Sequence, residues 1–436
     1  MTLFGLFLHH IKAFNLPHLR NNMLKKISIN QLRKDMFIHE FCGSWIDHPF
    51  WKKSFLVSTE EDFQSIQTSK ITELIIDTSK GVDVLDANQV LAAATPEPES
   101  PPAPAQSRPP AVRPAAISMD KELTNAAHII AQSKLAVRNM FQEARMGNTV
   151  DVDSMLPLVD EISESVSRNS SALIGLARLK TKDDYTYMHS IAVCALMIAL
   201  TRQLHLCEED VKEAGMAGLF HDIGKMATPN EILNKPGKLT DGEFDTVKQH
   251  PLAGYQILSR NKDISKVVLD VCLHHHEKVD GTGYPDKYSD EKISLMAKAG
   301  AVCDVYDAIT SNRPYKKGWC PAESIKKMSE WAGTHFDPHI FQAFVRSVGI
   351  YPAGSLVMLK SGRLGVIVGQ NDKSLLQPVV RAFFSSKSMS YVTPELIDLS
   401  KPGHNEKIIS TELVSKWGLK NIDQYWLGDA VNPGRF

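Results

Sequence analysis

Apolar residues recur with a helical period along most of the chain between residues 120 and 348. The segments "HIIAQSKLAVRNMFQEAR" (128–145) and "YMHSIAVCALMIALTRQL" (187–204) carry them at i, i+3, i+4 and i+7, which predicts amphipathic helices. Pro, Gly and Asp residues separate these segments and predict the turns between helices. The pattern therefore favours a mainly α fold, with an all-helical domain over residues 119–348.

Shorter apolar runs flank this helical region on both sides. Residues 26–90 include "KKISINQL", "KSFLVS" and "ITELIIDTS", which predict a small α/β or mostly β domain. The aromatic stretch "CGSWIDHPFW" there could form a ligand surface or the core of that domain. After the helices, "SLVMLKSGRLGVIVGQN" has two β-rich runs around Ser-Gly. This predicts a hairpin, so residues 349–436 are interpreted as a small β appendage and tail.

Two further segments lack the pattern of a folded domain. Residues 91–118 are dominated by Pro and Ala, which indicates a linker. Residues 1–25 are interpreted as an extension, and a misplaced start is one explanation for it. The run "LFGLFL" there is too short to span a bilayer. We expect no membrane-spanning segment elsewhere in the chain.

Composition limits the classes of partner and the compartment. Hydrophobic residues make up 43% of the chain, charged residues 23%, and the net charge is −1. This balance gives no electrostatic reason to bind a nucleic acid polymer or a membrane surface. No cysteine belongs to a C-x-x-C pair, so we expect reduced core residues in a cytoplasmic protein. The cysteines are Cys42, Cys194, Cys207, Cys272, Cys303 and Cys320.

The first stretch that carries chemistry is "FHDIGKM". On a helix, His221 and Lys225 would share a face, and Asp222 lies beside them. An imidazole and a carboxylate suit a divalent metal ion, and a carboxylate can bridge two ions. The ammonium of Lys225 is better suited to a phosphate oxygen.

Further candidate ligands recur at intervals on or beside the predicted helices: His189, His250, His275, His276 and Asp304. A single histidine in a helix is usually a surface or core residue, so the joint pattern carries the metal hypothesis. Adjacent helical residues point about 100° apart, so His275 and His276 should line a wide pocket rather than one narrow tetrahedral site. Seven N/O ligands without a thiolate suit two metal ions about 3.5–4 Å apart, as in phosphoester hydrolysis.

The rest of "LHHHEKVDGTGYPD" leaves its alternatives open. His274 is interpreted as structural or exposed. Glu277 could orient an imidazole or be a solvated residue at a helix end. Tyr284 could face a substrate or pack the loop. Downstream, Arg313 in "SNRPYKKG" could clamp a phosphate, or the basic loop with Lys317 could simply be solvated.

Together, "HDIGK", "HHEKVDGTGYP" and "DVYDAITSNRPY" resemble the HD-GYP domain, a bacterial branch of the HD metal-dependent phosphohydrolases. The resemblance covers residues 120–348. The block from "GSWIDHPFW" to "GVDV" resembles a small domain of unassigned activity found ahead of HD-GYP domains. The resemblance to the HD-GYP domain implies a phosphodiesterase. Such an enzyme hydrolyses cyclic di-GMP to linear pGpG, in some members on to GMP, or acts on 3′,3′-cyclic GMP-AMP.

The resemblance also assigns roles to residues. Its metals are iron or manganese, its phosphate-binding groups match Lys225 and Arg313, with Lys317 as a further candidate, and its name-giving triplet is Gly283, Tyr284 and Pro285. Asp222 and Lys225 are the catalytic candidates. Some members hold a third metal with a glutamate where this chain has Tyr185, so we expect two ions. The implied metal ligands are His189, His221, Asp222, His250, His275, His276 and Asp304.

Metal-assisted in-line hydrolysis is therefore the leading hypothesis. The alternatives are hydrolysis of another phosphoester and a non-catalytic cyclic dinucleotide receptor that signals through protein contacts. Possible protein partners are a dinucleotide cyclase or other signalling proteins. The helices of residues 120–180 could support a homodimer.

Overall fold

The structure is a computed structural model that describes residues 24–42, 55–67, 73–78, 80–84, 118–180, 184–311, 318–371, 374–403 and 405–427. The expectations about residues 1–23, and about almost all of the segment 91–118 and of "CGSWIDHPFW", lie outside this part of the chain. Contacts divide the chain into two units, Met1–Arg108 and Pro109–Phe436, which are described separately.

The N-terminal unit is a small α/β fold. Its 4-stranded antiparallel sheet has the order β1-β4-β2-β3. In β4, Leu74 and Ile76 are fully buried while Glu73 is exposed, so the alternation of the sequence selects the covered face. These side chains join the core with Ile38 and Val57. The elements are β1 (Leu24–Ser28), η1 (Ile29–Gln31), β2 (Phe37–Cys42), β3 (Phe55–Leu56), α1 (Glu60–Gln67) and β4 (Glu73–Asp77).

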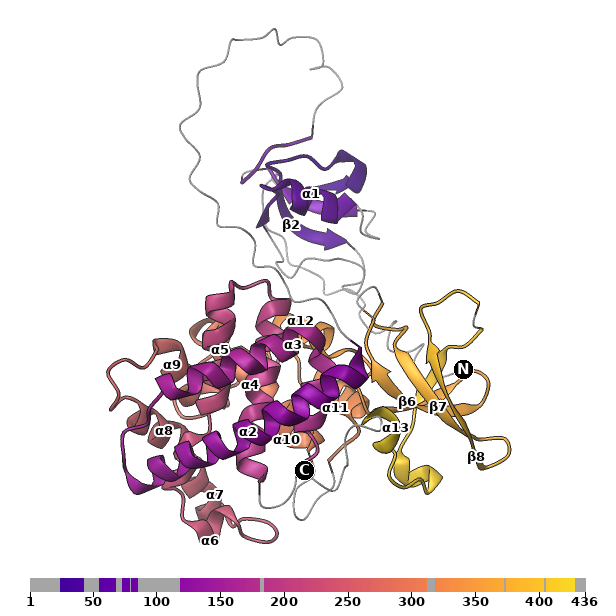
Figure 1. Cartoon of the computed structure of the whole chain (residues 1–436). Coiled ribbons are helices and arrows are strands. Elements are labelled where there is room, and N and C mark those ends of the chain that lie inside the picture. Colours follow the sequence, from indigo (N-terminus) through magenta and orange to yellow (C-terminus); the bar gives the residue numbers. More distant parts are fainter. Residues whose placement is uncertain are drawn as a thin grey trace. The chain divides into compact units, whose positions relative to one another are not determined.

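The second unit begins with the expected helices, so the mainly α fold is confirmed (Figure 1). The longer helices are α2 (Met119–Met146), α3 (Leu156–Ala177), α4 (Tyr185–Gln203), α5 (Glu208–Phe220), α8 (His250–Leu258), α9 (Lys266–His274), α10 (Leu295–Thr310), α11 (Pro321–Ser329) and α12 (Pro338–Val348). The shorter helical turns are η3 (Asp153–Met155), η4 (Ile223–Ala227), α6 (Asn230–Leu233), α7 (Asp241–Val247) and η5 (Asp290–Lys292).

Helix α4 is the centre of the helical part. Its residues from Met188 to Thr201 are all buried, because α2, α3, α5, α10 and α12 contact it from different sides. This is why its sequence is apolar on every face rather than on one stripe. A polar side chain on α4, such as His189, is thereby held inside the domain.

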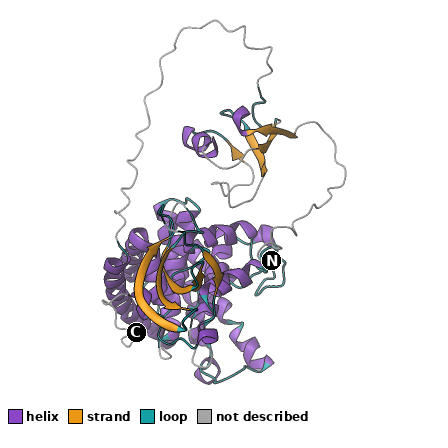
Figure 2. Cartoon of the chain, turned by 90° about the vertical axis from the view of Figure 1, so that its right-hand side faces the viewer, coloured by secondary structure: helices purple, strands orange, loops and turns teal. Residues whose placement is uncertain are grey.

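A 5-stranded antiparallel sheet follows the helices, in the order β8-β7-β6-β5-β9. Figure 2 shows its strands in orange in front of the helices of the same unit. The predicted hairpin is confirmed as β5 paired with β6, joined by the turn at Ser361 and Gly362. The sheet also contains strands that the hairpin alone did not predict. The elements are β5 (Leu356–Leu359), β6 (Arg363–Gly369), β7 (Val379–Ser385), β8 (Ser390–Asp398), β9 (Ile408–Thr411), η6 (Val414–Trp417) and α13 (Gln424–Leu427).

The C-terminal segment reaches back to the helices through Trp426. This side chain is fully buried. A Cβ placed on Gly175 of α3 would lie 2.9 Å from the indole ring, so only glycine leaves room for it. The guanidinium of Arg178 on the same helix end lies 5.9 Å from the indole centroid. The sheet and the last turn of α3 therefore form one packed region.

None of the described helices is long and apolar enough to cross a membrane. Among the described residues, Cys194, Cys207, Cys272, Cys303 and Cys320 are free thiols. The prediction of core positions is correct for Cys194, Cys272 and Cys303, which are buried. It is wrong for Cys207, which is exposed because it precedes the first turn of α5.

Candidate metal centre

Five helices supply the side chains of the centre. His189 lies in the second turn of α4, His221 caps the end of α5, His250 begins α8, and Asp304 lies in α10. His275 and His276 follow α9 directly. All of these side chains except that of His276 are almost completely buried. The structure thus brings together residues that lie far apart in the sequence.

A close backbone contact places the "HDIGK" segment beside His250. A Cβ on Gly224 would lie 1.9 Å from the carbonyl oxygen of His250 and 2.4 Å from the amide nitrogen of Gly254. Glycine is therefore required for η4 to lie against α8. Asp222 and His250 come within contact distance as a result, with 3.2 Å between Oδ1 and Nε2.

Four imidazoles turn the same nitrogen toward the interior. The Nδ1–H groups of His221, His250 and His275 donate to backbone carbonyls of Gly218, Val247 and Val271, at 2.8, 2.7 and 3.0 Å. The Nδ1–H of His189 donates instead to the carboxylate of Asp307, at 2.6 Å. These bonds fix the tautomer, so each Nε2 presents a lone pair to the centre.

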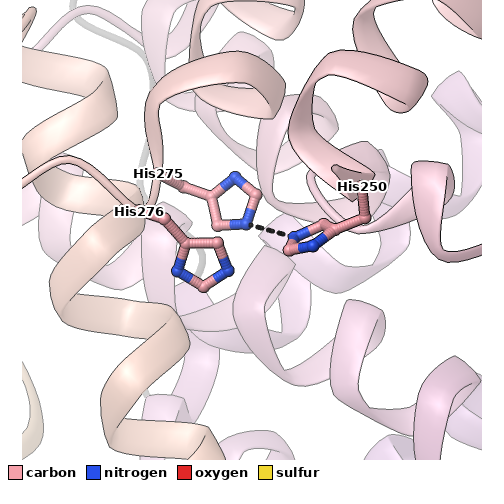
Figure 3. A group of neighbouring side chains, drawn as sticks. All are labelled: His250, His275 and His276. Atoms are coloured by element: carbon pink, nitrogen blue, oxygen red, sulfur yellow. Dashed lines mark hydrogen bonds between the residues drawn. The ribbon is translucent and has the colours of Figure 1, made fainter. Parts of the chain in front are cut away.

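The lone pairs face one another in two pairs. Nε2 of His189 lies 3.2 Å from Nε2 of His221. Nε2 of His250 lies 3.3 Å from Nε2 of His275, with His276 beside them (Figure 3). Two lone pairs at this separation repel unless a cation or a proton lies between them. The arrangement is therefore suited to divalent metal ions.

Asp222 connects the two histidine pairs. Its Oδ2 lies 3.3 Å from Nε2 of His189 and 3.4 Å from Nε2 of His221. Its Oδ1 lies 3.2 Å from Nε2 of His250 and is buried without a hydrogen-bond donor. A buried carboxylate oxygen without a donor is costly, and a metal ion would satisfy it.

Three groups of donor atoms are compact enough to hold a metal ion, each with its donors within 4.8 Å of one another. They are His250, His275 and His276; His189, His221 and Asp304; and His221, Asp222 and His275. Both His275 and His276 contribute to the first group, and His275 also contributes to the third. Helix α9 ends at His274, so the two residues lie in its exit turn, where the helical angle between neighbours does not apply.

The charges of the centre set the protonation of its members when no metal is bound. Burial alone would lower the pKa of His189, but the carboxylates of Asp222, Asp304 and Asp307 raise it to about 10. Burial lowers the pKa of His276 to about 3 and that of His275 well below its usual value. Asp222 resists the effect of burial because Lys225 and His221 hold its pKa well below the usual range. The carboxylates and the neutral imidazoles of His275 and His276 are thus available as ligands, and a metal ion would displace the proton that His189 holds.

Lys225 belongs to the centre, but not in the predicted geometry. Helix α5 ends at Phe220, so His221 and Lys225 do not lie on one helical face. The 3₁₀ turn of η4 instead brings the ammonium of Lys225 into an ion pair with Asp222. Its side chain is 23% exposed and can be reached from outside, whereas Asp222 cannot.

The loop after the histidines packs onto the centre. The ring of Tyr284 stacks on His276 with 4.8 Å between centroids, and its amide donates to the carbonyl of His276. The peptide bond between Tyr284 and Pro285 is cis. Gly283 lies so close to the backbone of Glu277 that a Cβ would be 2.5 Å from its Cα. The triplet therefore forms a wall beside one of the candidate ligands.

The side chains of Glu277 and His274 hold the loop that follows α9. Glu277 is buried, and its carboxylate accepts the amides of Asp286 and Tyr288 at 2.7 and 3.1 Å. It is thus not a solvated residue, and it anchors the loop. His274 contacts the carboxylates of Asp270 and Asp286 at 2.7 and 3.1 Å.

Two members of the surroundings were not predicted. Asp307 accepts the Nδ1–H of His189, and Lys180 pairs with Asp307. Asp307 lies one turn after Asp304 in "DVYDAIT", and this spacing could have indicated it. No sequence signal indicates Lys180, which follows α3. Arg313 and Lys317 lie in the segment 312–317, outside the described residues.

The fold and the site define an HD-domain protein. Residues 160–340 match the family model described as an HD domain, and residues 24–155 match a domain of unknown function (DUF3391). HD-domain phosphohydrolases are metal-dependent, which agrees with the donor groups described above.

Within that class, the chain belongs to the HD-GYP family of cyclic dinucleotide phosphodiesterases. It is 51% identical to a cyclic di-GMP phosphodiesterase of Pseudomonas aeruginosa over 95% of this chain and 98% of that protein. It is 39% identical to a cyclic di-GMP phosphodiesterase response regulator of Xanthomonas campestris, over 43% of this chain and 50% of that one. A 3′3′-cGAMP-specific phosphodiesterase of Vibrio cholerae is 32% identical over 48% of this chain and 44% of its own length.

Proposed function

We propose that this protein is a metal-dependent phosphodiesterase that hydrolyses a cyclic dinucleotide, with cyclic di-GMP as the first candidate and 3′,3′-cyclic GMP-AMP as the second. The observation that carries the proposal is the position of Asp222 between two pairs of inward-facing imidazole lone pairs. The Pseudomonas aeruginosa relative, which matches over nearly its whole length, supports the first candidate.

The ligands divide into two sets that share Asp222. One consists of His189, His221 and Asp304, and the other of His250, His275 and His276. Two divalent ions held there would activate water and polarise a phosphoryl oxygen. Nitrogen and oxygen donors without a thiolate suit iron or manganese.

The position that could add a third ion carries Tyr185, whose ring stacks on His189 with 6.0 Å between centroids. A stacked phenol does not replace a carboxylate ligand. We therefore propose a binuclear centre, and the linear dinucleotide pGpG as the product from cyclic di-GMP.

Lys225 and Tyr284 are the proposed substrate contacts among the described residues. Lys225 is the partly exposed cation next to the buried carboxylate, so its ammonium can turn to a phosphate oxygen and stabilise charge there. Tyr284 is half-buried and lies over His276, where it can line the pocket for a base or ribose. Arg313 and Lys317 are proposed as further phosphate contacts from their sequence positions alone.

The division of the chain into domains is proposed with one change from the sequence-based bounds, because β1 begins at Leu24 and pairs with β4. The parts are an extension (1–23), a small α/β domain (24–90), a linker (91–118), the catalytic domain (119–348) and a β appendage with a tail (349–436). The separation into units at residue 108 and the HD match over residues 160–340 support the boundaries around the catalytic domain. A dinucleotide cyclase or another signalling protein remains the proposed kind of partner, and a homodimer the proposed assembly.

A paired turnover assay tests the function. The purified full chain, kept anaerobic and analysed for metal content, is given cyclic di-GMP and 3′,3′-cyclic GMP-AMP separately in large excess. We expect cleavage of at least one to the linear dinucleotide, lost in His221→Ala and retained in His128→Ala, which removes an exposed histidine of α2. Binding without product at stoichiometric excess would instead favour a receptor, and neither binding nor product would favour another phosphoester.

A further inference from the structure

One of the four inward-facing imidazoles is held differently from the others. His221, His250 and His275 each donate their Nδ1–H to a neutral backbone carbonyl that lies three or four residues before them in the chain. His189 donates to the carboxylate of Asp307, which belongs to another helix, α10. The ring of His189 is therefore oriented by a charged side chain of another helix, whereas backbone carbonyls orient the other three imidazoles.

Asp307 is itself held by Lys180. The ammonium of Lys180 pairs with Oδ2 of Asp307, the same oxygen that accepts from His189. The side chain of Lys180 is 0% exposed and that of Asp307 is 4% exposed. A lysine so completely buried is rare, and removing either partner would leave an uncompensated charge inside the domain.

Lys180 also reaches the other side of the His189 ring through Tyr185. The ammonium lies 5.3 Å from the centroid of Tyr185, within the range of a cation–π contact. Tyr185 in turn stacks on His189 at an interplanar angle of 9°. Lys180 thus contacts both groups that hold this imidazole, one at its edge and one at its face.

We infer that Lys180 is a positioning residue of the metal centre, which acts through Asp307 and Tyr185 to fix the ring of His189. Its contacts with Asp307 and Tyr185 are the route by which it acts on His189. Its role is to make the ion at His189, His221 and Asp304 bind more tightly than this donor set would on its own. The two metal positions are therefore unequal, and only one depends on the end of α3. This inference rests on the metal centre of the proposed function.

The test measures metal binding rather than turnover. The metal-free full chain is titrated with Mn²⁺, and free Mn²⁺ is followed by its electron paramagnetic resonance signal. In Lys180→Met we expect one of two bound ions to weaken by about 10–100-fold, the usual effect of losing such an outer contact, while the other is unchanged. Lys180→Arg, which keeps a cation, should recover most of the affinity.

Two further variants keep the test decisive if Lys180→Met fails to fold. The double variant Lys180→Met/Asp307→Asn removes both buried charges together and should fold better, yet it should still weaken one ion. The matched control is Lys212→Met, which breaks an exposed pair with Asp160 and should leave both ions unchanged.

The outcomes separate this inference from the proposed function. Wild-type binding of both ions in the folded double variant, or equal weakening of both, would overturn the positioning role. Binding of two Mn²⁺ ions by the wild type without any cleavage would overturn the phosphodiesterase proposal and leave the positioning role standing. A wild-type chain that binds no Mn²⁺ would contradict both.

Discussion

The two oxygens of Asp222 face different pairs of histidines, so a single side chain joins the two proposed metal positions. Its neighbour Lys225 balances the charge and is the more exposed of the two. This division of roles follows from burial: the carboxylate faces the ligands and the ammonium can face a substrate. At the scale of the residue, the centre is therefore most sensitive at Asp222.

Asp222→Asn should lower turnover by about 100-fold or more, because an amide cannot supply two anionic oxygens to two ions. The measurement is cyclic di-GMP cleavage at fixed metal concentration, together with the number of Mn²⁺ ions bound. Asp160→Asn, at an exposed position, serves as the control. Equal turnover in Asp222→Asn and wild type would show that the carboxylate does not join the positions.

The residues of the motifs could be proposed from the sequence because their side-chain chemistry is visible there. Asp307 and Lys180 were missed for a different reason. Their role arises only where the end of α3 meets α10, and this contact is decided by packing. The sequence also missed that His275 and His276 lie after the helix rather than on it, because the exact end of α9 cannot be read from an apolar period.

At the scale of the element, the turn after α9 depends on an internal anchor. The buried carboxylate of Glu277 accepts two backbone amides of the loop, which replaces the hydrogen bonds that a regular element would supply. The same loop presents Tyr284 to His276. The shape of the pocket wall is thus linked to one glutamate that does not face the donors.

Glu277→Gln should destabilise the protein by about 1–3 kcal/mol, because an amide group can oppose one of the donated N–H groups. We expect turnover to fall while bound metal stays at the wild-type level, since Glu277 is not among the candidate ligands. Thermal unfolding, metal content and turnover are measured side by side. The exposed Glu291→Gln is the control, and loss of metal in Glu277→Gln would contradict this role.

At the scale of the whole molecule, the C-terminal sheet and the catalytic helices share a packed contact. Trp426 fills the space that Gly175 leaves on α3, and Lys180 follows five residues later in the chain. The sequence predicted a hairpin in this region but not the contact between the C-terminal segment and α3. The identity of the helix that a buried tryptophan contacts cannot be read from the sequence around it. The contact between Trp426 and α3 thus lies close in the chain to the lysine that holds Asp307.

Trp426→Ala should cost about 3–5 kcal/mol of unfolding free energy, as expected for truncating a fully buried aromatic side chain. Chemical denaturation of the wild type and the variant measures this loss of unfolding free energy. Trp417→Ala, at a half-buried position of the same segment, should cost clearly less. Equal losses would mean that the contact with Gly175 contributes nothing particular.

Removing the metal should lower the thermal unfolding midpoint of the whole catalytic domain. At a free metal concentration 100 times the dissociation constant, binding stabilises the folded state by about 2.7 kcal/mol. Scanning calorimetry with and without a chelator measures the shift, and adding Mn²⁺ back should restore it. An unchanged midpoint would mean that the donors hold their arrangement without assistance from a cation.

The wide spacing of the donor residues along the chain has a consequence for the rate at which the protein unfolds. His189 and Asp304 lie on different helices and are far apart along the chain, and Asp222 lies between them in the sequence. The full donor set can form only after those helices have closed, so the ion adds little to an early folding nucleus. It should act mainly on the unfolding step, which makes the loaded protein long-lived rather than quick to fold.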